Sequence, residues 1–189
     1  MFSKKNRSLS NTLLGLFLIA IVLESLSSIL PYQHLGSYAL NEYFALPEVK
    51  LFIPLLFLHF ILTKLGNSER YATFLRVNYG IAVGIALIFL GNLWLFFTRS
   101  TSFVQAFDFF IIDRIHFLFQ LYAFLISIIV FVLACKELVW VKRLIQNEYS
   151  DYGMLQIKWL WRFNLLLFPA ILFWAAELFR IIIAPDIES

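Results

Sequence analysis

The sequence predicts an all-α protein: a bundle of five transmembrane helices that forms a single domain over residues 1–189. Three observations lead to this fold class. The composition is 61% hydrophobic and 14% charged, whereas a soluble domain is about 45–50% apolar and about 25% charged. Five apolar runs are long enough to cross a bilayer, and the Lys and Arg residues gather in alternate connections. A soluble monomer is therefore excluded.

A helix needs roughly 20 mainly apolar residues to cross the hydrocarbon core, with a working range of about 17–25. The segments that meet this requirement are Leu13–Leu30, Val49–Leu65, Val77–Phe97, Phe117–Cys135 and Phe163–Ile183. The polar stretches between them are too short to hold a further folded domain.

The first two spans carry ionisable residues and a proline. The first span contains Glu24 and is longer than the uncharged core of a signal peptide, so we expect it to remain uncleaved. The second span contains His59 near its middle and Pro54, which removes a backbone hydrogen bond and is expected to kink the helix.

The fourth span is followed by residues that can continue its helix, whereas the fifth span contains a proline. The fourth span leads into mixed apolar and charged residues without Gly or Pro, so its helix is expected to continue to about Asn147 as an amphipathic extension. The fifth span contains Pro169, for which we expect a second kink. The 22 Phe residues are expected to face lipid for the most part.

The distribution of basic residues predicts the orientation of the spans. Eleven of the fifteen Lys and Arg residues lie before the first span or in the second and fourth connections. Because Lys and Arg are enriched on the cytoplasmic side, the N-terminus is expected in the cytoplasm and the C-terminus outside. The protein is therefore expected in a bacterial inner membrane, with the lipid bilayer as its main surroundings.

The third span carries a stripe of small residues, Gly80, Gly84 and Gly91, which fall on one side of a helix. Small residues spaced in this way allow two helix backbones to approach closely in lipid. We expect them to pack inside the monomer. Packing between protomers of a homo-oligomer is the alternative.

Several ionisable residues are predicted to share one level of the membrane, near its outer surface. Ionisable groups at membrane depth are costly and are functional candidates by default. The candidate ligand-binding residues are Glu24, His34, Asp113, Arg114, His116, Glu177 and Arg180. We favour an internal ion pair among Glu24, Glu177 and Arg180 that fixes the helix register, and a polar pocket open to the outside is the alternative.

Signatures of enzymes and metal sites are not found in the sequence. The three histidines, His34, His59 and His116, have no partner three or four residues away, so a zinc motif is not predicted. No phosphate-binding loop or nucleophile elbow is present. We assign no catalytic residue, metal or cofactor, and we favour a non-enzymatic role. A small carrier or enzyme that uses Glu24, Glu177 and Arg180 is kept as an alternative.

The cytoplasmic side offers a basic surface for a protein partner. The residues considered are Lys136, Lys142, Arg143 and Lys158. The net charge of +3 is small and serves orientation, so direct binding to nucleic acid is not expected.

The order of these segments resembles the multi-pass sensor region of membrane-bound AraC-type bacterial transcription regulators. The resemblance lies in a polar lead at 6–11, a proline-containing stretch at 54–58, a basic segment with Tyr-Ser at 142–150, and Ile-Lys-Trp-Leu at 157–160. It covers the middle five of the seven spans usual in that family, and no DNA-binding helix-turn-helix comes after them. The resemblance implies a sensor-like bundle that signals through a separate protein, and it identifies no ligand-binding residue.

Two functional hypotheses of different classes fit these features. The first is a small sensor or accessory protein that acts through a cytoplasmic partner. The second is an oligomeric membrane effector or pore of a bacterial defence system, in which the glycine stripe packs between protomers and Asn92 or Gln120 lines a path.

Overall fold

The computed structural model describes residues 4–29, 47–97, 109–147 and 151–183, and within these ranges it contains helices and no strand. Its elements, in chain order, are α1 (Lys4–Ile29), α3 (Pro47–Leu65), the short 3₁₀ helix η2 (Ser68–Tyr71), α4 (Ala72–Phe97), α6 (Phe109–Asn147) and α7 (Asp151–Ile183). The all-α prediction is confirmed.

The helices end close to where the sequence predicts. The extension of the fourth predicted span does end at Asn147, and α3 ends at Leu65. The helices begin earlier than the apolar runs, most clearly α7, which starts at Asp151 rather than at Phe163. Polar residues such as Lys, Arg and Gln are good helix formers, so a helix extends beyond the apolar segment until a breaker stops it.

A glycine turn ends α3 and reverses the chain. Gly66 has a φ of 78°, which is accessible to glycine at little cost. The N–H of Asn67 donates to the carbonyl of Leu62 at 2.9 Å, and the N–H of Gly66 donates to the carbonyl of Thr63 at 3.3 Å. These two bonds form a Schellman motif, which satisfies the last carbonyls of the helix. The turn leads directly into η2 and α4.

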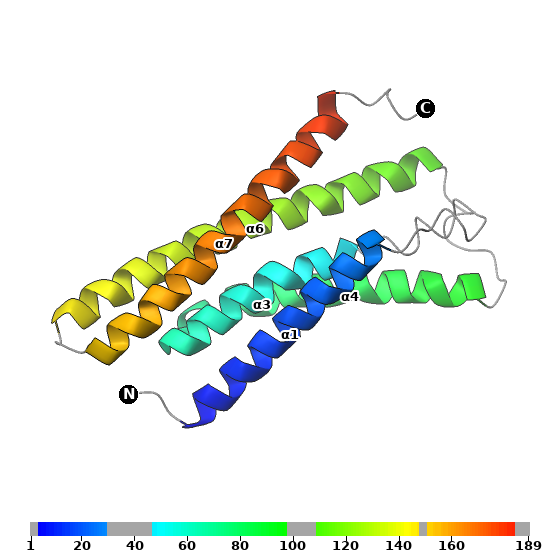
Figure 1. Ribbon diagram of the computed structural model, residues 1–189. Coiled ribbons are helices and arrows are strands. Elements are labelled where there is room, and N and C mark those ends of the chain that lie inside the picture. Colours follow the sequence, from blue (N-terminus) through cyan, green and yellow to red (C-terminus); the bar gives the residue numbers. More distant parts are fainter. Residues whose placement is uncertain (1–3, 30–46, 98–108, 148–150, 184–189) are drawn as a thin grey trace.

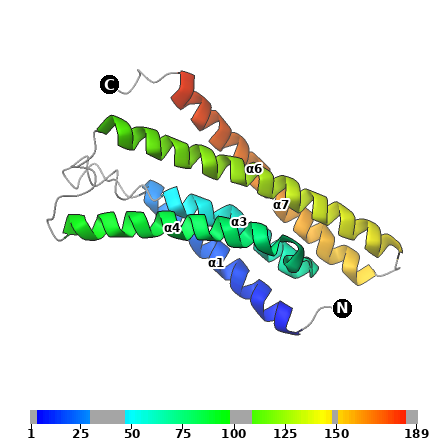
Figure 2. The same ribbon diagram turned by 180° about the vertical axis from the view of Figure 1, so that it is seen from behind.

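Successive helices run in alternating directions, and the start of α1 and the end of α7 lie at opposite ends of the bundle (Figure 1). In that view α1 and α7 lie in front. The reverse view places α4 and α6 in front, so α3 lies between two layers (Figure 2). Accordingly, α3 contacts α1, α4 and α6, and α6 also packs against α7.

Helix α3 forms the centre of the hydrophobic core. Its side chains are apolar almost all round, and most of them between Leu51 and Thr63 are buried. Leu55, Leu58, Ile61 and Leu62 are each at most 1% exposed. Every exposed large hydrophobic side chain of the described residues lies instead on α1, α4, α6 or α7.

The outer helices present a surface suited to lipid. Leu166 and Phe173 of α7 are 74% and 78% exposed, and Leu87 and Ile88 of α4 are more than 60% exposed. Apolar exposure on this scale is rare in a soluble monomer.

Three stretches of the described residues are long and apolar enough to cross a membrane. They are Ser68–Ile88, Phe117–Leu144 and Lys158–Ala176. The apolar stretch in α1, Leu9–Ser25, is shorter. In α3 the uncharged stretch between Lys50 and Lys64 is short. These features indicate a membrane protein.

Aromatic rings from three helices meet inside the bundle, so some Phe residues pack against one another rather than facing lipid. Phe17 of α1 and Phe57 of α3 are each 1% exposed, with ring centroids 5.6 Å apart. Phe163 of α7 lies within 6.4 Å of both rings and of Phe60, and stacks on Trp159 at 5.4 Å. The rings fill the space where α1, α3 and α7 meet. Phe168 and Phe173, in contrast, are exposed as expected.

We expect Leu58→Ala to destabilise the protein by about 2–5 kcal/mol, because the substitution leaves a cavity in a fully buried site. Leu166→Ala, the same change at a 74% exposed position of α7, is expected to change stability by less than about 0.5 kcal/mol. Thermal unfolding of the two variants in the same detergent provides the measurement. Equal losses in both variants would show that α3 is not the core.

Candidate functional site

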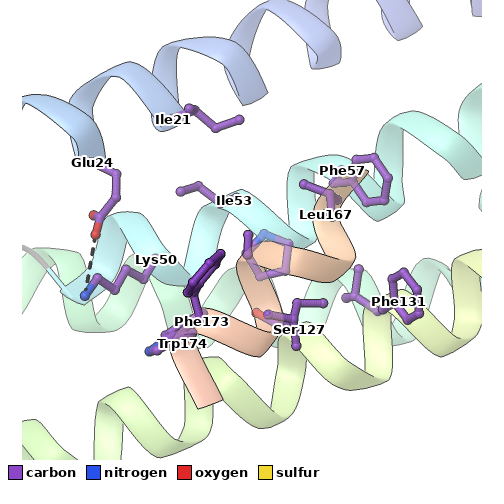
Figure 3. Close-up of a pocket in the computed structure, with 14 residues that line it drawn as sticks. Ile21, Glu24, Lys50, Ile53, Phe57, Ser127, Phe131, Leu167, Phe173 and Trp174 are labelled. Atoms are coloured by element: carbon purple, nitrogen blue, oxygen red, sulfur yellow. Dashed lines mark ion pairs between the residues drawn. The ribbon is translucent and has the colours of Figure 1, made fainter. Parts of the chain in front are cut away.

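A cavity of about 540 Å³ opens between α1, α3, α6 and α7 (Figure 3). Its size falls in the range of about 300–1,000 Å³ that is usual for small-molecule sites. The lining residues are mostly apolar and come from all four helices: Ile21, Glu24, Lys50, Ile53, Pro54, Phe57, Ser127, Val130, Phe131, Leu167, Ala170, Ile171, Phe173 and Trp174.

One end of the cavity is charged. The Lys50 ammonium lies 3.5 Å from a carboxylate oxygen of Glu24, and the two side chains are 28% and 24% exposed. The same ammonium lies over the ring of Trp174, 5.8 Å from its centroid. The lysine thus joins α1, α3 and α7 through an ion pair and a cation–π contact.

The rest of the cavity is apolar. Phe57, Phe131 and Leu167 lie away from the ion pair, and Ser127 lies between them and the charged end (Figure 3). The hydroxyl of Ser127 donates to the carbonyl of Ala123 at 2.9 Å, which satisfies it within its own helix. Among the described residues, no histidine, cysteine or second acid lines the cavity.

The structure places the predicted outer residues only in part. Glu24 does lie in an ion pair, formed with Lys50, a residue that is not among the predicted site residues. His34 lies outside the described residues. The remaining candidates fall within the helices at this end of the bundle, although their side chains lie outside the described part: Asp113, Arg114 and His116 in α6, and Glu177 and Arg180 in α7.

A second polar site, which the sequence reasoning missed, surrounds Glu137 of α6. Its carboxylate is fully buried and accepts hydrogen bonds from the Asn67 amide at 2.8 Å and from the Tyr71 hydroxyl at 2.7 Å. The Arg70 guanidinium approaches it at 3.5 Å and is itself largely exposed. The three partners belong to the turn after α3 and to η2, so the carboxylate ties this turn to α6.

The Schellman turn explains why these donors converge. Gly66 reverses the chain, which brings Asn67 to the side of α6, and η2 then presents Arg70 and Tyr71 next to it. A buried charge is tolerated only when it is paired and hydrogen-bonded, and Glu137 meets both conditions. In the sequence, Glu137 stands out only as a single acid within a basic segment. An acid on the polar face of an amphipathic helix gives the same pattern, so the sequence does not predict that Glu137 is buried.

Three further contacts that involve polar side chains join neighbouring helices. The hydroxyl of Tyr122 on α6 donates to the Asn78 side-chain oxygen on α4 at 2.7 Å. The buried amide of Asn164 on α7 donates to the sulfur of Cys135 on α6 at 3.1 Å. His59 contacts the ring of Tyr79, with centroids 5.9 Å apart. These residues connect neighbouring helices.

The predicted partner-binding residues are all exposed. Lys136, Lys142 and Arg143 lie on α6 and Lys158 lies on α7. Exposed apolar groups accompany them, including Trp140 at 44%. The surface is therefore basic and partly apolar.

The glycine stripe does not pack inside the chain, contrary to our expectation. A Cβ added at Gly80, Gly84 or Gly91 would meet nothing within 4 Å. Helix α4 buries its other side instead, through Leu75, Asn78, Ala82 and Ile85. These residues recur every three or four positions and so share one face of α4, which leaves the glycines on the opposite side.

Among the described residues, no three His, Cys, Asp or Glu side chains are grouped so that they could hold a metal ion. Comparison with protein-family models, with curated proteins and with solved structures gave no match. The resemblance to AraC-type membrane regulators therefore stays a prediction.

We expect Glu137→Ala to destabilise the protein by about 3 kcal/mol, because the Asn67 amide and the Tyr71 hydroxyl lose their acceptor in a buried site. Glu69→Ala, which removes an exposed acid of η2, is the matched control and is expected to change stability by less than about 0.5 kcal/mol. The midpoint of thermal unfolding in detergent compares them. If the Glu137 variant melts with the control, the contact does not stabilise the turn.

Proposed function

We propose that this protein is a small, non-enzymatic sensor or accessory protein of a bacterial inner membrane. It crosses the membrane five times, with the N-terminus in the cytoplasm and the C-terminus outside, and it acts through a cytoplasmic protein partner. The alternating directions of the helices and the gathering of basic residues at one end support this topology.

The observation that carries the proposal is the course of α6. This helix lines the cavity with Ser127, Val130 and Phe131, passes the buried Glu137, and continues without a break to the exposed Lys142 and Arg143. The distance along the helix from Phe131 to Lys142 is about 16 Å at 1.5 Å per residue. A molecule in the cavity thus contacts the same rigid element that presents the basic surface.

The charge of that surface indicates the kind of partner. Basic side chains beside exposed apolar groups match a protein face that is acidic at its rim and apolar at its centre. The resemblance to a sensor region agrees with an output that passes through a second protein.

We expect the double variant Lys142→Glu, Arg143→Glu to reduce recovery of a cytoplasmic partner, cross-linked in membranes and purified in detergent, by about tenfold or more, because like charges then face each other. Arg76→Glu, a charge reversal at an exposed position of α4, is the control and is expected to leave recovery unchanged. Quantitative mass spectrometry of the recovered proteins compares the wild type, the double variant and the control. Unchanged recovery with the double variant would rule out this surface.

A second candidate function is an oligomeric membrane effector or pore. The observation that favours it is the open glycine stripe on α4, since small residues without an intramolecular contact can serve helix packing between protomers.

In that case the protein releases a dye from liposomes, and Gly84→Leu reduces release several-fold because a large side chain separates the packed backbones. Gly15→Leu, at a glycine of α1 that also has nothing within 4 Å, is the control. A monomeric protein that leaves liposomes intact would contradict the pore.

A further inference from the structure

We propose that the cavity between α1, α3, α6 and α7 binds a zwitterionic amphiphile, a molecule with one acyl chain and a head that carries a phosphate and an ammonium group. Only the role of this ligand as a signal rests on the proposed sensor function. Its binding is measured without any partner protein.

The first argument is the balance of charge. Among the described residues, those that line the cavity include one carboxylate, Glu24, and one ammonium, Lys50, 3.5 Å apart. An anionic head that bound Lys50 would place a second negative charge beside Glu24. A cationic head that bound Glu24 would place a second positive charge beside Lys50. In a site of low polarity each unpaired charge is costly. A head with both charges leaves every charge paired.

The second argument is the geometry of the ion pair. A charge-assisted hydrogen bond between nitrogen and oxygen is usually about 2.7–2.9 Å long, so the separation of 3.5 Å is loose. The Lys50 ammonium has three N–H donors, and a phosphate oxygen can occupy one that the Glu24 contact leaves. Glu24 and the ring of Trp174, the two groups that hold the Lys50 ammonium, also form a site for the ammonium of the ligand.

The third argument is the shape of the cavity. The ion pair lies at one end, and Phe57, Phe131 and Leu167 lie away from it (Figure 3). An amphiphile places its head and chain in the same order. Phe173, which lines the cavity, is 78% exposed, so the wall on the α7 side borders the surroundings of the bundle, from which a lipid enters.

The experiment uses the full-length protein in a nonionic detergent and measures equilibrium binding of radiolabelled amphiphiles with the same acyl chain. The probes are lysophosphatidylethanolamine, which is zwitterionic, lysophosphatidylglycerol, which is anionic, and a monoacylglycerol, which is uncharged. Glycerophosphoethanolamine, the head without the chain, serves as a competitor. We expect the zwitterionic probe to bind about tenfold tighter than the other two, and the head alone not to compete.

Two substitutions test the charges separately. Lys50→Gln is expected to weaken binding of the zwitterionic probe by about 10- to 100-fold, because the phosphate loses a charged donor. Glu24→Gln is expected to weaken it as well and, with the negative charge removed, to make the anionic probe the tighter ligand. This reversal of preference is not expected from a purely structural ion pair. Glu69→Gln, at an exposed acid of η2, is the control and is expected to bind like the wild type.

A third substitution tests the apolar part. Ala170→Phe adds a large side chain to the lining and is expected to weaken binding of all three probes equally. Elution as a single species and an unchanged unfolding midpoint verify that each variant is folded.

The proposal is overturned if the three probes bind equally, if none binds, or if Glu24→Gln leaves the order of preference unchanged. These results leave the partner surface on α6 untouched, so they do not bear on the sensor function. Conversely, if the zwitterionic probe binds as expected but has no effect on partner recovery, the sensor function is wrong while the ligand assignment holds.

Discussion

The enclosure of α3 by its neighbours is the constraint on which the rest of the structure depends. Packing against α1, α4 and α6 buries most of its side chains between Leu51 and Thr63. Its position also fixes both polar sites. Lys50, at its start, reaches Glu24 on α1, and the turn after Leu65 delivers donors to Glu137 on α6. One buried helix thereby determines where charge is held at each end of the bundle.

The sequence is sufficient to predict the helices but not their neighbours. Apolar runs and breakers locate the ends of α3 and α6, because the energy of keeping polar residues out of lipid depends on composition alone. The contacts of Phe57 and Phe163 depend on which faces meet, and a helix that is apolar on all sides carries no signal for this. The same limit applies to the glycine stripe of α4. Its periodic spacing indicates a packing surface, but it does not indicate whether a helix of the same chain or of another protomer packs there.

The polar sites were predictable to different degrees. Glu24 could be identified because an acid within an apolar run is conspicuous. To identify Lys50 as its partner, one must know that the end of α1 lies beside the start of α3. An opposite charge at a similar depth in the next antiparallel helix is the signal that could have found it. Glu137 was harder, since its basic surroundings in the sequence hide that the side chain faces inward. Its donors, Asn67 and Tyr71, lie some 70 positions away in the chain.

Helix α6 is longer than the hydrocarbon core of a bilayer is thick. Its 39 residues span about 58 Å, almost twice the hydrocarbon thickness of about 30 Å. If the hydrocarbon core ends near Cys135, as the proposed topology has it, Lys142 and Arg143 lie about 10–12 Å beyond that level, only a few Å past the headgroup layer. That gap is shorter than the screening length of about 8 Å at physiological salt, so both side chains remain within electrostatic reach of the headgroups. A protein that binds them therefore approaches along the membrane surface.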